Sequence, residues 1–256
     1  IILGNLGNLH YHQGRNAVAL MHYEQALTIA REVGNRSHEN NTLGNLGTLH
    51  SDQGRIAEGL SYYQQALSVA REVGDHRGEV IVLGNLGLLH HDQGRSEQGL
   101  KHYKQALIMA RKIGNRYNEG LVLGNLGDLH YDSDDLAAAE RYLQQAVEMN
   151  DEGFPAVAGA FRGTLALIRA EAGALEEARA LLKKGDSQTR GVWTFELAKL
   201  LCKRARVEQR AGDTDAAAAA LAEAETIATE VGASTDSDLG QEIAKARAAL
   251  AGPEPR

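Results

Sequence analysis

The segment Leu3-Gly4-Asn5-Leu6-Gly7 decides the fold, because it returns three times at a spacing of 40 residues. Its copies stand at residues 43–47, 83–87 and 123–127, with no insertion between them. Other positions keep the same step, among them His10, His50, His90 and His130, and Ala26, Ala66, Ala106 and Ala146. We therefore interpret residues 1–150 as four near-exact tandem repeats, the first of them truncated at its N-terminal side.

The apolar spacing within one repeat is typical of two helices. One stripe falls within about 100° on a helix that turns 100° per residue, and it consists of Leu3, Leu6, Gly7 and His10. The second stripe consists of Ala19, Tyr23, Ala26, Ala30 and Val33. A single helical hairpin cannot bury both stripes, so successive hairpins must stack. The predicted fold is an all-α solenoid of stacked antiparallel helix pairs.

Glycines and short polar residues mark the ends of the predicted helices. Gly14 and Gly34 suit a left-handed helix end. The expected caps of the following helices are Asn35, Asp75 and Asn115. Gly7 and Ala26 are small where the two helices of a pair must approach closely, and we expect a larger side chain there to push them apart.

These residues resemble the tetratricopeptide repeats. The family's Leu-Gly, aromatic, Ala, aromatic, Ala pattern is matched by Leu6-Gly7, His10, Ala19, Tyr23 and Ala26, with His10 in place of the first aromatic residue. The 40-residue unit looks like the longer-repeat branch of the spindle-orientation LGN/Pins proteins and kinesin light chain. The resemblance implies a right-handed superhelix in which the first helix of each pair lines a concave groove.

The composition changes after Asn150, where His and Asn are absent and Ala becomes common. Residues 151–236 are predicted to form two degenerate hairpins of the same kind. Their helices are expected at Val157–Ala172, Leu175–Lys183, Thr194–Ala211 and Thr214–Val231. In residues 237–256 we expect a capping helix at Leu239–Leu250, followed by a disordered tail.

The candidate binding site lies on the face of the first helices that is opposite the core stripe. Its residues are Asn5, Asn8, His12, Asn45, Thr48, Asp52, Asn85, Leu88, Asp92, Asn125, Asp128 and Asp132. Each Asn amide offers a donor and an acceptor, so a column of them can pair with the backbone of an extended peptide. The resemblance implies the same use of Asn ladders. The four Asp residues favour a ligand that carries Lys or Arg.

A second interpretation of the Asn column stays open. Asn5 and its equivalents would instead bond to neighbouring helices and fix the stacking of the repeats. Arg36 and Arg116, with His76 between them, start successive first helices. They either reach the groove edge or an acidic partner, or they belong to a solvated face.

Composition excludes several other classes of protein. The 256 residues carry a formal net charge of −7, which lacks the basic footprint of a nucleic-acid-binding protein. The single Cys202 excludes a disulfide framework and a thiolate metal cluster, and it fits a cytoplasmic location. No apolar run approaches the roughly 20 residues that a bilayer-spanning helix needs, so no membrane partner is expected.

Metal, cofactor and catalytic sites are not expected either. The ten histidines all lie in the first 130 residues. Equivalent residues of stacked hairpins are about 10 Å apart, whereas a metal holds its ligands at about 2.1 Å. The residues show no catalytic constellation, and the repeated Gly-x-x-Gly lies inside a helix and does not follow a strand, as a phosphate-binding loop would.

The sequence therefore predicts a non-enzymatic protein-interaction scaffold, a monomer that binds an extended peptide or a disordered partner segment. Because the chain begins inside the repeated pattern, we expect it to be part of a longer protein. This motivates an alternative, in which it is the regulatory sensor domain of a signalling ATPase, kinase or transcription regulator. A third alternative is a structural array that associates with itself end to end.

Overall fold

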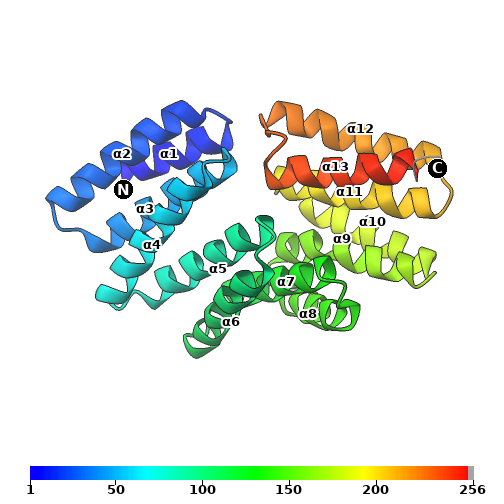
Figure 1. Cartoon of the computed structure of the whole chain (residues 1–256), viewed down its shortest axis with the longest axis horizontal. Helices are drawn as coiled ribbons and strands as arrows, with labels where there is room; N and C mark the ends of the chain where they lie inside the picture. The colour runs from blue at the N-terminus through cyan, green and yellow to red at the C-terminus, as the bar shows by residue number, and fades with distance from the viewer. Residues whose placement is uncertain (253–256) are drawn as a thin grey trace. The chain divides into compact units, whose positions relative to one another are not determined.

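The computed structural model describes residues 1–252, except for the side chain of His12. All secondary structure in this part of the chain is helical (Figure 1). The first eight helices are α1 (Ile2–His12), α2 (Asn16–Glu32), α3 (Arg36–Asp52), α4 (Ile56–Glu72), α5 (His76–Asp92), α6 (Ser96–Lys112), α7 (Arg116–Asp132) and α8 (Leu136–Asn150). The others are α9 (Pro155–Glu171), α10 (Leu175–Thr189), α11 (Thr194–Arg210), α12 (Thr214–Glu230) and α13 (Asp238–Ala251). The predicted all-α class and the order of helix pairs are confirmed.

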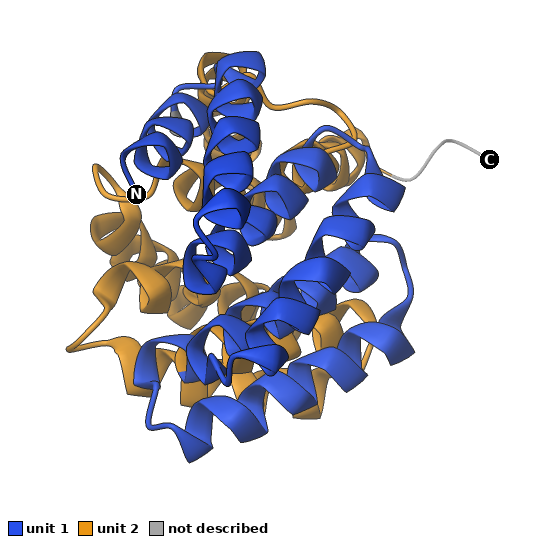
Figure 2. Cartoon of the chain, turned by 90° about the vertical axis from the view of Figure 1, so that its left-hand side faces the viewer, with its two compact units in different colours: residues 1–119 blue, residues 120–256 orange. Residues whose placement is uncertain are grey.

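The chain divides into two compact units (Figure 2). Unit 1 contains Ile1–Glu119 and unit 2 contains Gly120–Arg256. The boundary falls within α7, whereas the composition changes only after Asn150. The division into regular and degenerate repeats at that residue therefore stays a prediction about sequence regularity. The tail beyond Gly252, which the sequence predicts to be disordered, lies outside the described residues.

The predicted helix ends are present in the structure. Gly14 and Gly34 have φ angles of 70° and 66°, in the left-handed region that favours glycine. Asp134 occupies the equivalent place in the fourth repeat, at a φ of 62°. The caps Asn35, Asp75 and Asn115 accept hydrogen bonds from the backbone N–H groups of His38, Gly78 and Asn118 at 3.1, 2.9 and 3.2 Å.

Glycine is required where the two helices of a pair approach each other. A Cβ on Gly47 would lie 2.6 Å from a ring carbon of Tyr63, a distance that real Cβ atoms do not show. The same relationship holds for Gly7 with Tyr23 and for Gly87 with Tyr103, at 2.4 and 2.5 Å. The predicted close approach at the second glycine of the repeat is therefore confirmed, and the Tyr ring of the second helix is its cause.

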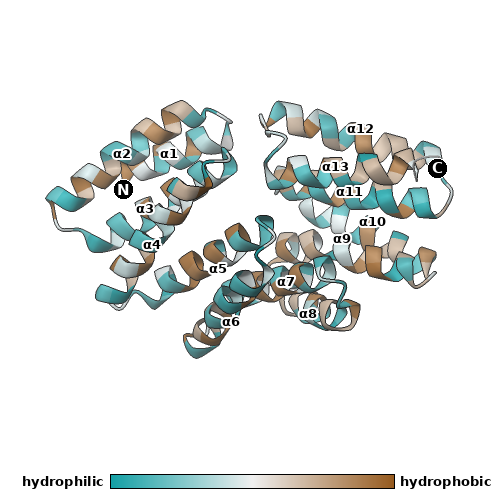
Figure 3. Cartoon of the chain, in the orientation of Figure 1, coloured by the Kyte–Doolittle hydropathy of each residue, from teal (hydrophilic) through white to brown (hydrophobic). Residues whose placement is uncertain are grey.

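The core of unit 1 is built from the repeated leucines and tyrosines. Leu43, Leu46 and Leu49 of α3 are fully buried, and they cluster with Tyr23 and Tyr63. Hydrophobic and hydrophilic bands follow one another along α2 and α6 (Figure 3), as on an amphipathic helix, where apolar residues recur every three to four positions. The assignment of Val33 to the buried stripe is wrong. Val33 is 69% exposed, because it follows the last residue of α2 and caps that helix.

Unit 2 buries α9 almost completely, between α10 and α11. Its helices begin and end within two residues of the predicted bounds, except that α10 continues to Thr189. We ended that helix at Lys183, two residues before Gly185. Gly185 lies inside α10. A Cβ there would be 3.0 Å from the backbone oxygen of Gly159, so glycine allows the close approach of α10 to α9.

The last helix, α13, packs on α11 and α12 as the predicted cap. Leu239, Ile243 and Ala246 are buried in this contact. Cys202 is also buried there, and burial raises the pKa of its thiol to about 12. No helix in residues 1–252 is long and apolar enough to cross a bilayer.

Candidate functional site

A cavity of about 300 Å³ opens along the first helices of the first three repeats, α1, α3 and α5. It lies entirely in unit 1. Four residues of the predicted site line it, namely Asn5, Asn8, Asn45 and Asn85. The lining also contains Ile1, Asn41 and Ile81, which stand at one repeat position on the face opposite the core stripe. The repeat therefore brings four predicted amides to one hollow.

The other predicted site residues do not line this cavity. Thr48 is half-buried, and its hydroxyl lies 3.0 Å from the hydroxyl of Tyr63. Leu88 is exposed, Asp52 is exposed and Asp92 is half-buried. Asn125, Asp128 and Asp132 belong to unit 2. The side chain of His12 lies outside the described part of the chain.

Asn8 joins three helices through one oxygen atom. Its Oδ1 accepts a hydrogen bond from Nδ2 of Asn45 at 2.9 Å and another from the hydroxyl of Tyr23 at 2.7 Å. Burial raises the pKa of Tyr23 to about 12, so this phenol keeps its proton at neutral pH. The bonds connect α1 with α2 and α3, which is the geometry that the stacking interpretation of the Asn column requires for this pair.

Three of the predicted carboxylates are already engaged within the chain. Asp52 accepts a hydrogen bond from the hydroxyl of Tyr11. Asp128 accepts one from Oγ1 of Thr164 at 2.6 Å, and Asp132 lies 3.6 Å from Nζ of Lys245. Burial, together with the Asp52 carboxylate, raises the pKa of Tyr11. A basic ligand would therefore share these carboxylates with internal partners.

The cavity also presents a buried polar atom without a partner. Asn40 is 1% exposed, and its Nδ2 donates to Oδ2 of Asp75 at 3.3 Å. Asn40 lines the cavity, and its Oδ1 is buried and accepts no hydrogen bond from any described residue. Sequence reasoning missed Asn40 because Val80 and Gly120 replace it in the later repeats. The signal in the sequence was a single amide at a repeat position where the later repeats carry Val or Gly.

The first glycine of the repeated segment faces this cavity. Gly4 and Gly44 line it, and no described atom lies within 4 Å of the position that a Cβ on either residue would take. The second glycines, Gly7 and Gly47, are instead covered by tyrosine rings. The two glycines of the repeat thus have different surroundings, one in the core and one at the hollow.

Family models match nearly the whole chain. The model of the MalT-like TPR region matches residues 35–253, and a tetratricopeptide repeat model matches residues 2–40. The chain belongs to the tetratricopeptide repeat family. The resemblance to the LGN/Pins and kinesin light chain branch stays an expectation. A comparison with curated proteins found no match.

Solved structures share the TPR fold of this chain. BtubC (BKLC) from P. vanneervenii superposes with a TM-score of 0.64 at 18% identity, covering 91% of each chain. A Rap protein complexed with competence and sporulation factor gives 0.73 at 18%, covering 97% of this chain and 75% of that one. NprR in complex with its cognate peptide NprX gives 0.67 at 19%, covering 96% and 74%. At these identities the likeness establishes the fold alone.

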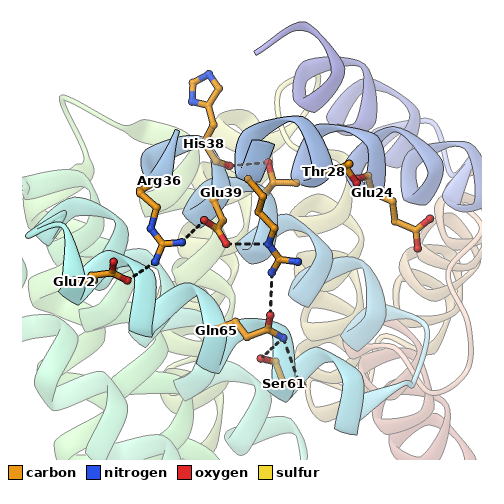
Figure 4. Close-up of polar contacts among 10 residues, drawn as sticks. Glu24, Thr28, Arg36, His38, Glu39, Ser61, Gln65 and Glu72 are labelled. Atoms are coloured by element: carbon orange, nitrogen blue, oxygen red, sulfur yellow. Dashed lines mark hydrogen bonds and ion pairs between the residues drawn. The ribbon is translucent and has the colours of Figure 1, made fainter. Parts of the chain in front are cut away.

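A recurring ion pair joins successive TPR repeats. Glu39 is buried and pairs with Arg31 of α2 at 3.0 Å and with Arg36, which also pairs with Glu72 of α4 (Figure 4). The pair returns 40 residues on as Arg71–Glu79 and again as Arg111–Glu119, each at 2.8 Å. Arg36 is therefore engaged within the chain and is not merely solvated. We missed this pair, although the constant step of its members was visible in the sequence.

Each histidine of the His column contacts a ring on the second helix of its own repeat. His10 lies on His22, His50 on Tyr62, His90 on His102 and His130 on Tyr142, with ring centroids 5.0 to 5.3 Å apart. Burial lowers the pKa of His50, His90 and His102. In residues 1–252, leaving out the His12 side chain, no three His, Cys, Asp or Glu residues are grouped so that they could hold a metal ion.

Proposed function

We propose that the cavity along α1, α3 and α5 binds an extended peptide or a disordered segment of a partner protein. The observation that carries this proposal is the chemistry of the lining. Six asparagines line the cavity, and no Asp, Glu, Lys or Arg is among the described residues around it. A neutral amide can donate to a peptide carbonyl and accept from a peptide N–H, and both groups recur along any extended chain.

Some of the cavity asparagines are bonded to each other and others are exposed, and this difference supports the same function. Asn8 and Asn45 bond to each other and fix the spacing of α1 and α3. Asn5 and Asn41 are exposed at the same hollow. A rigid pair beside accessible amides lets the site present donors and acceptors at a fixed distance, which lowers the entropy that binding must overcome.

Two of the structurally similar TPR proteins also support it. The Rap protein was solved with competence and sporulation factor, and NprR with its cognate peptide NprX. The likeness to each covers more than nine-tenths of this chain. The proposal carries over only the class of ligand, a peptide, and not a sequence.

The ends of α3 and α5 give this peptide a preferred charge. Asp52 and Asp92 are the last residues of these helices, where the helix dipole also places negative charge. We propose that Lys or Arg residues flank the part of the peptide that enters the cavity. Because Asp52 also binds Tyr11, the charge preference is expected to be modest and to weaken with added salt.

A display experiment tests the function. A library of random 12-residue peptides is selected on the immobilised 256-residue chain, and enriched peptides are titrated by fluorescence anisotropy. Replacing Asn41 and Asn85 together by Ala is expected to weaken binding by about tenfold or more, since each lost hydrogen bond contributes about 1 kcal/mol. Both residues line the cavity.

The matched control is Gln64→Ala, an exposed amide on α4 that does not line the cavity. It is expected to leave the affinity unchanged. Circular dichroism and thermal melting of all variants confirm that they are folded. A library that yields no enriched peptide, or peptides that bind the Asn variant as tightly as the parent chain, would refute the proposal.

A further inference from the structure

Gly4 and Gly44 have no packing reason to be glycine. Glycine weakens the interior of a helix, because the unfolded chain gains freedom and no side chain is buried. Gly7 and Gly47 are explained by the Tyr rings that cover them. At Gly4 and Gly44 the space beyond the backbone is open, and it belongs to the cavity along α1, α3 and α5.

Unit 2 shows what fills this space when the chain itself supplies a side chain. Gly124 occupies the same place in the fourth repeat as Gly44 does in the second. The ring of Phe161 of α9 lies directly on it, so that a Cβ on Gly124 would be 2.2 Å from a ring carbon. The glycine at this position of the fourth repeat thus leaves a space above its backbone that an aromatic ring fills. We call this space the seat.

In unit 1 the chain does not supply that ring. Phe161 stands five residues before Ala166, the small residue that corresponds to the second glycine of the repeated segment. Five residues before Gly87 the chain has Val82. Val82 is buried, yet it leaves the seat on Gly44 open to the cavity. A ring from outside the chain can occupy the space that Phe161 takes in unit 2.

A second, independent observation gives the chemistry of this ring. Asn40 precedes Gly44 by four residues, so the two lie one turn apart on the same face of α3. Both residues line the cavity. Oδ1 of Asn40 is buried and has no donor among the described residues. A buried acceptor that is left unpaired is unfavourable, and a ligand that brings a donor removes this penalty.

We propose that the cavity is the anchor site for one tyrosine side chain of the bound peptide. The inference rests on the proposed peptide-binding function and names the residue that such a peptide must carry. The phenyl ring lies on the backbone of Gly44, as the ring of Phe161 lies on Gly124. The hydroxyl at its far end donates to Oδ1 of Asn40. Tyrosine is selected because its ring has the size of the phenylalanine ring that already fits this seat.

The test uses the full 256-residue chain and peptides enriched from the random 12-residue library. Each enriched peptide is synthesised with Tyr, Phe or Ala at its aromatic position and titrated by fluorescence anisotropy. Replacing Tyr by Ala is expected to weaken binding about thirtyfold or more, and replacing Tyr by Phe about tenfold, the effect of one hydrogen bond to a buried acceptor. In Asn40→Ala the Tyr and Phe peptides are expected to bind equally.

Gly44→Ala is the decisive variant, because a Cβ there meets no atom of the protein and fills the seat. It is expected to weaken the Tyr peptide at least tenfold while the melting temperature stays the same or rises. Gly44→Ala therefore still tests the proposal if Asn40→Ala, a substitution at a buried residue, folds poorly. Gln64→Ala is the control for binding, as before.

The outcomes separate the two proposals. A library that enriches no peptide overturns the peptide-binding function and this inference with it. Peptides that bind without an aromatic residue, or that bind Gly44→Ala as tightly as the parent chain, leave peptide binding in place and overturn the tyrosine anchor. Equal affinity of the Tyr and Phe peptides for the parent chain overturns the role of Asn40.

Discussion

The side-chain amide of Asn45 donates to Oδ1 of Asn8, 2.9 Å away, and so joins the first helices of two successive repeats. The same oxygen accepts the hydroxyl proton of Tyr23 from the second helix of the first repeat. One amide thus ties together both kinds of contact in the solenoid, between the helices of a pair and between successive pairs. The Asn column contributes to stacking at this point as well as to the lining of the cavity.

Asn8→Ala is expected to lower the free energy of unfolding by about 1–3 kcal/mol, because it leaves both the Asn45 amide and the Tyr23 hydroxyl without their acceptor. The measurement is urea denaturation followed by circular dichroism. Asn5→Ala, an exposed position on the same helix, is the matched control and should change the value by less than about 0.5 kcal/mol. Equal losses in the two variants would contradict the stacking role of Asn8.

The two glycines of the repeated segment are expected to respond in opposite directions to alanine. Gly87→Ala places a Cβ 2.5 Å from a ring carbon of Tyr103, and it should destabilise the chain by about 1–3 kcal/mol. Gly44→Ala meets open space and should stabilise it by up to about 1 kcal/mol, because alanine is the better helix former. Urea denaturation of both variants measures the difference. A loss of stability in Gly44→Ala would show that this position is packed.

The sequence was sufficient for the helix pairs, their caps and the close approach of the two helices at Gly7, because a strict repeat shows the same local pattern several times. It was insufficient where one residue depends on a partner outside its own repeat. The predicted helix ends at Lys183, whereas the observed one continues past Gly185, which packs against the backbone of Gly159. The ring of Phe161 on Gly124 likewise depends on the degenerate part of the chain.

The candidate site shows the same limit. The amides of Asn5 and Asn85 could be assigned to one face from the helical period, and both line the cavity. The bond between Asn8 and Asn45 could not be assigned, because side-chain direction decides whether two neighbouring amides meet. The unpaired, buried acceptor of Asn40 results from the packing of α3 against the cap at Asp75, and no period in the sequence predicts it.

Asp134→Gly is expected to stabilise the protein. Asp134 has a φ of 62° at a turn where the first three repeats carry glycine, and an L-residue in the left-handed region is strained. Glycine removes this strain, so the free energy of unfolding should rise by up to about 1 kcal/mol. The reverse exchange, Gly94→Asp, at the same place in the third repeat, should lower it by a similar amount. Thermal melting of the pair measures both, and a change of the same sign in the two variants would contradict the explanation.

The half-buried histidines His90 and His102 are expected to make the fold sensitive to mild acid. Burial is the main cause that lowers the pKa of His90 and His102 from 6.5, and for His102 the nearby His90, Lys101 and Arg71 lower it further. As the pH falls below 6.5, the unfolded chain therefore takes up protons before the folded chain does. The stability that these two neutral rings contribute is fully present above this pH, and it is lost as the pH falls through their folded-state pKa values.

His102→Tyr should reduce this sensitivity. The second and fourth repeats carry Tyr62 and Tyr142 at the same position, each in ring contact with its histidine, so the fold accepts tyrosine there. The variant removes one titrating ring and the repulsion between the protonated rings of His90 and His102, whose centroids lie 5.3 Å apart. Urea midpoints at about pH 7.5 and pH 5 should differ less in the variant than in the parent chain. Gln105→Ala, an exposed change on the same helix, should keep the parental difference. If His102→Tyr keeps the parental difference too, the acid sensitivity does not arise from His102 or from its repulsion with His90.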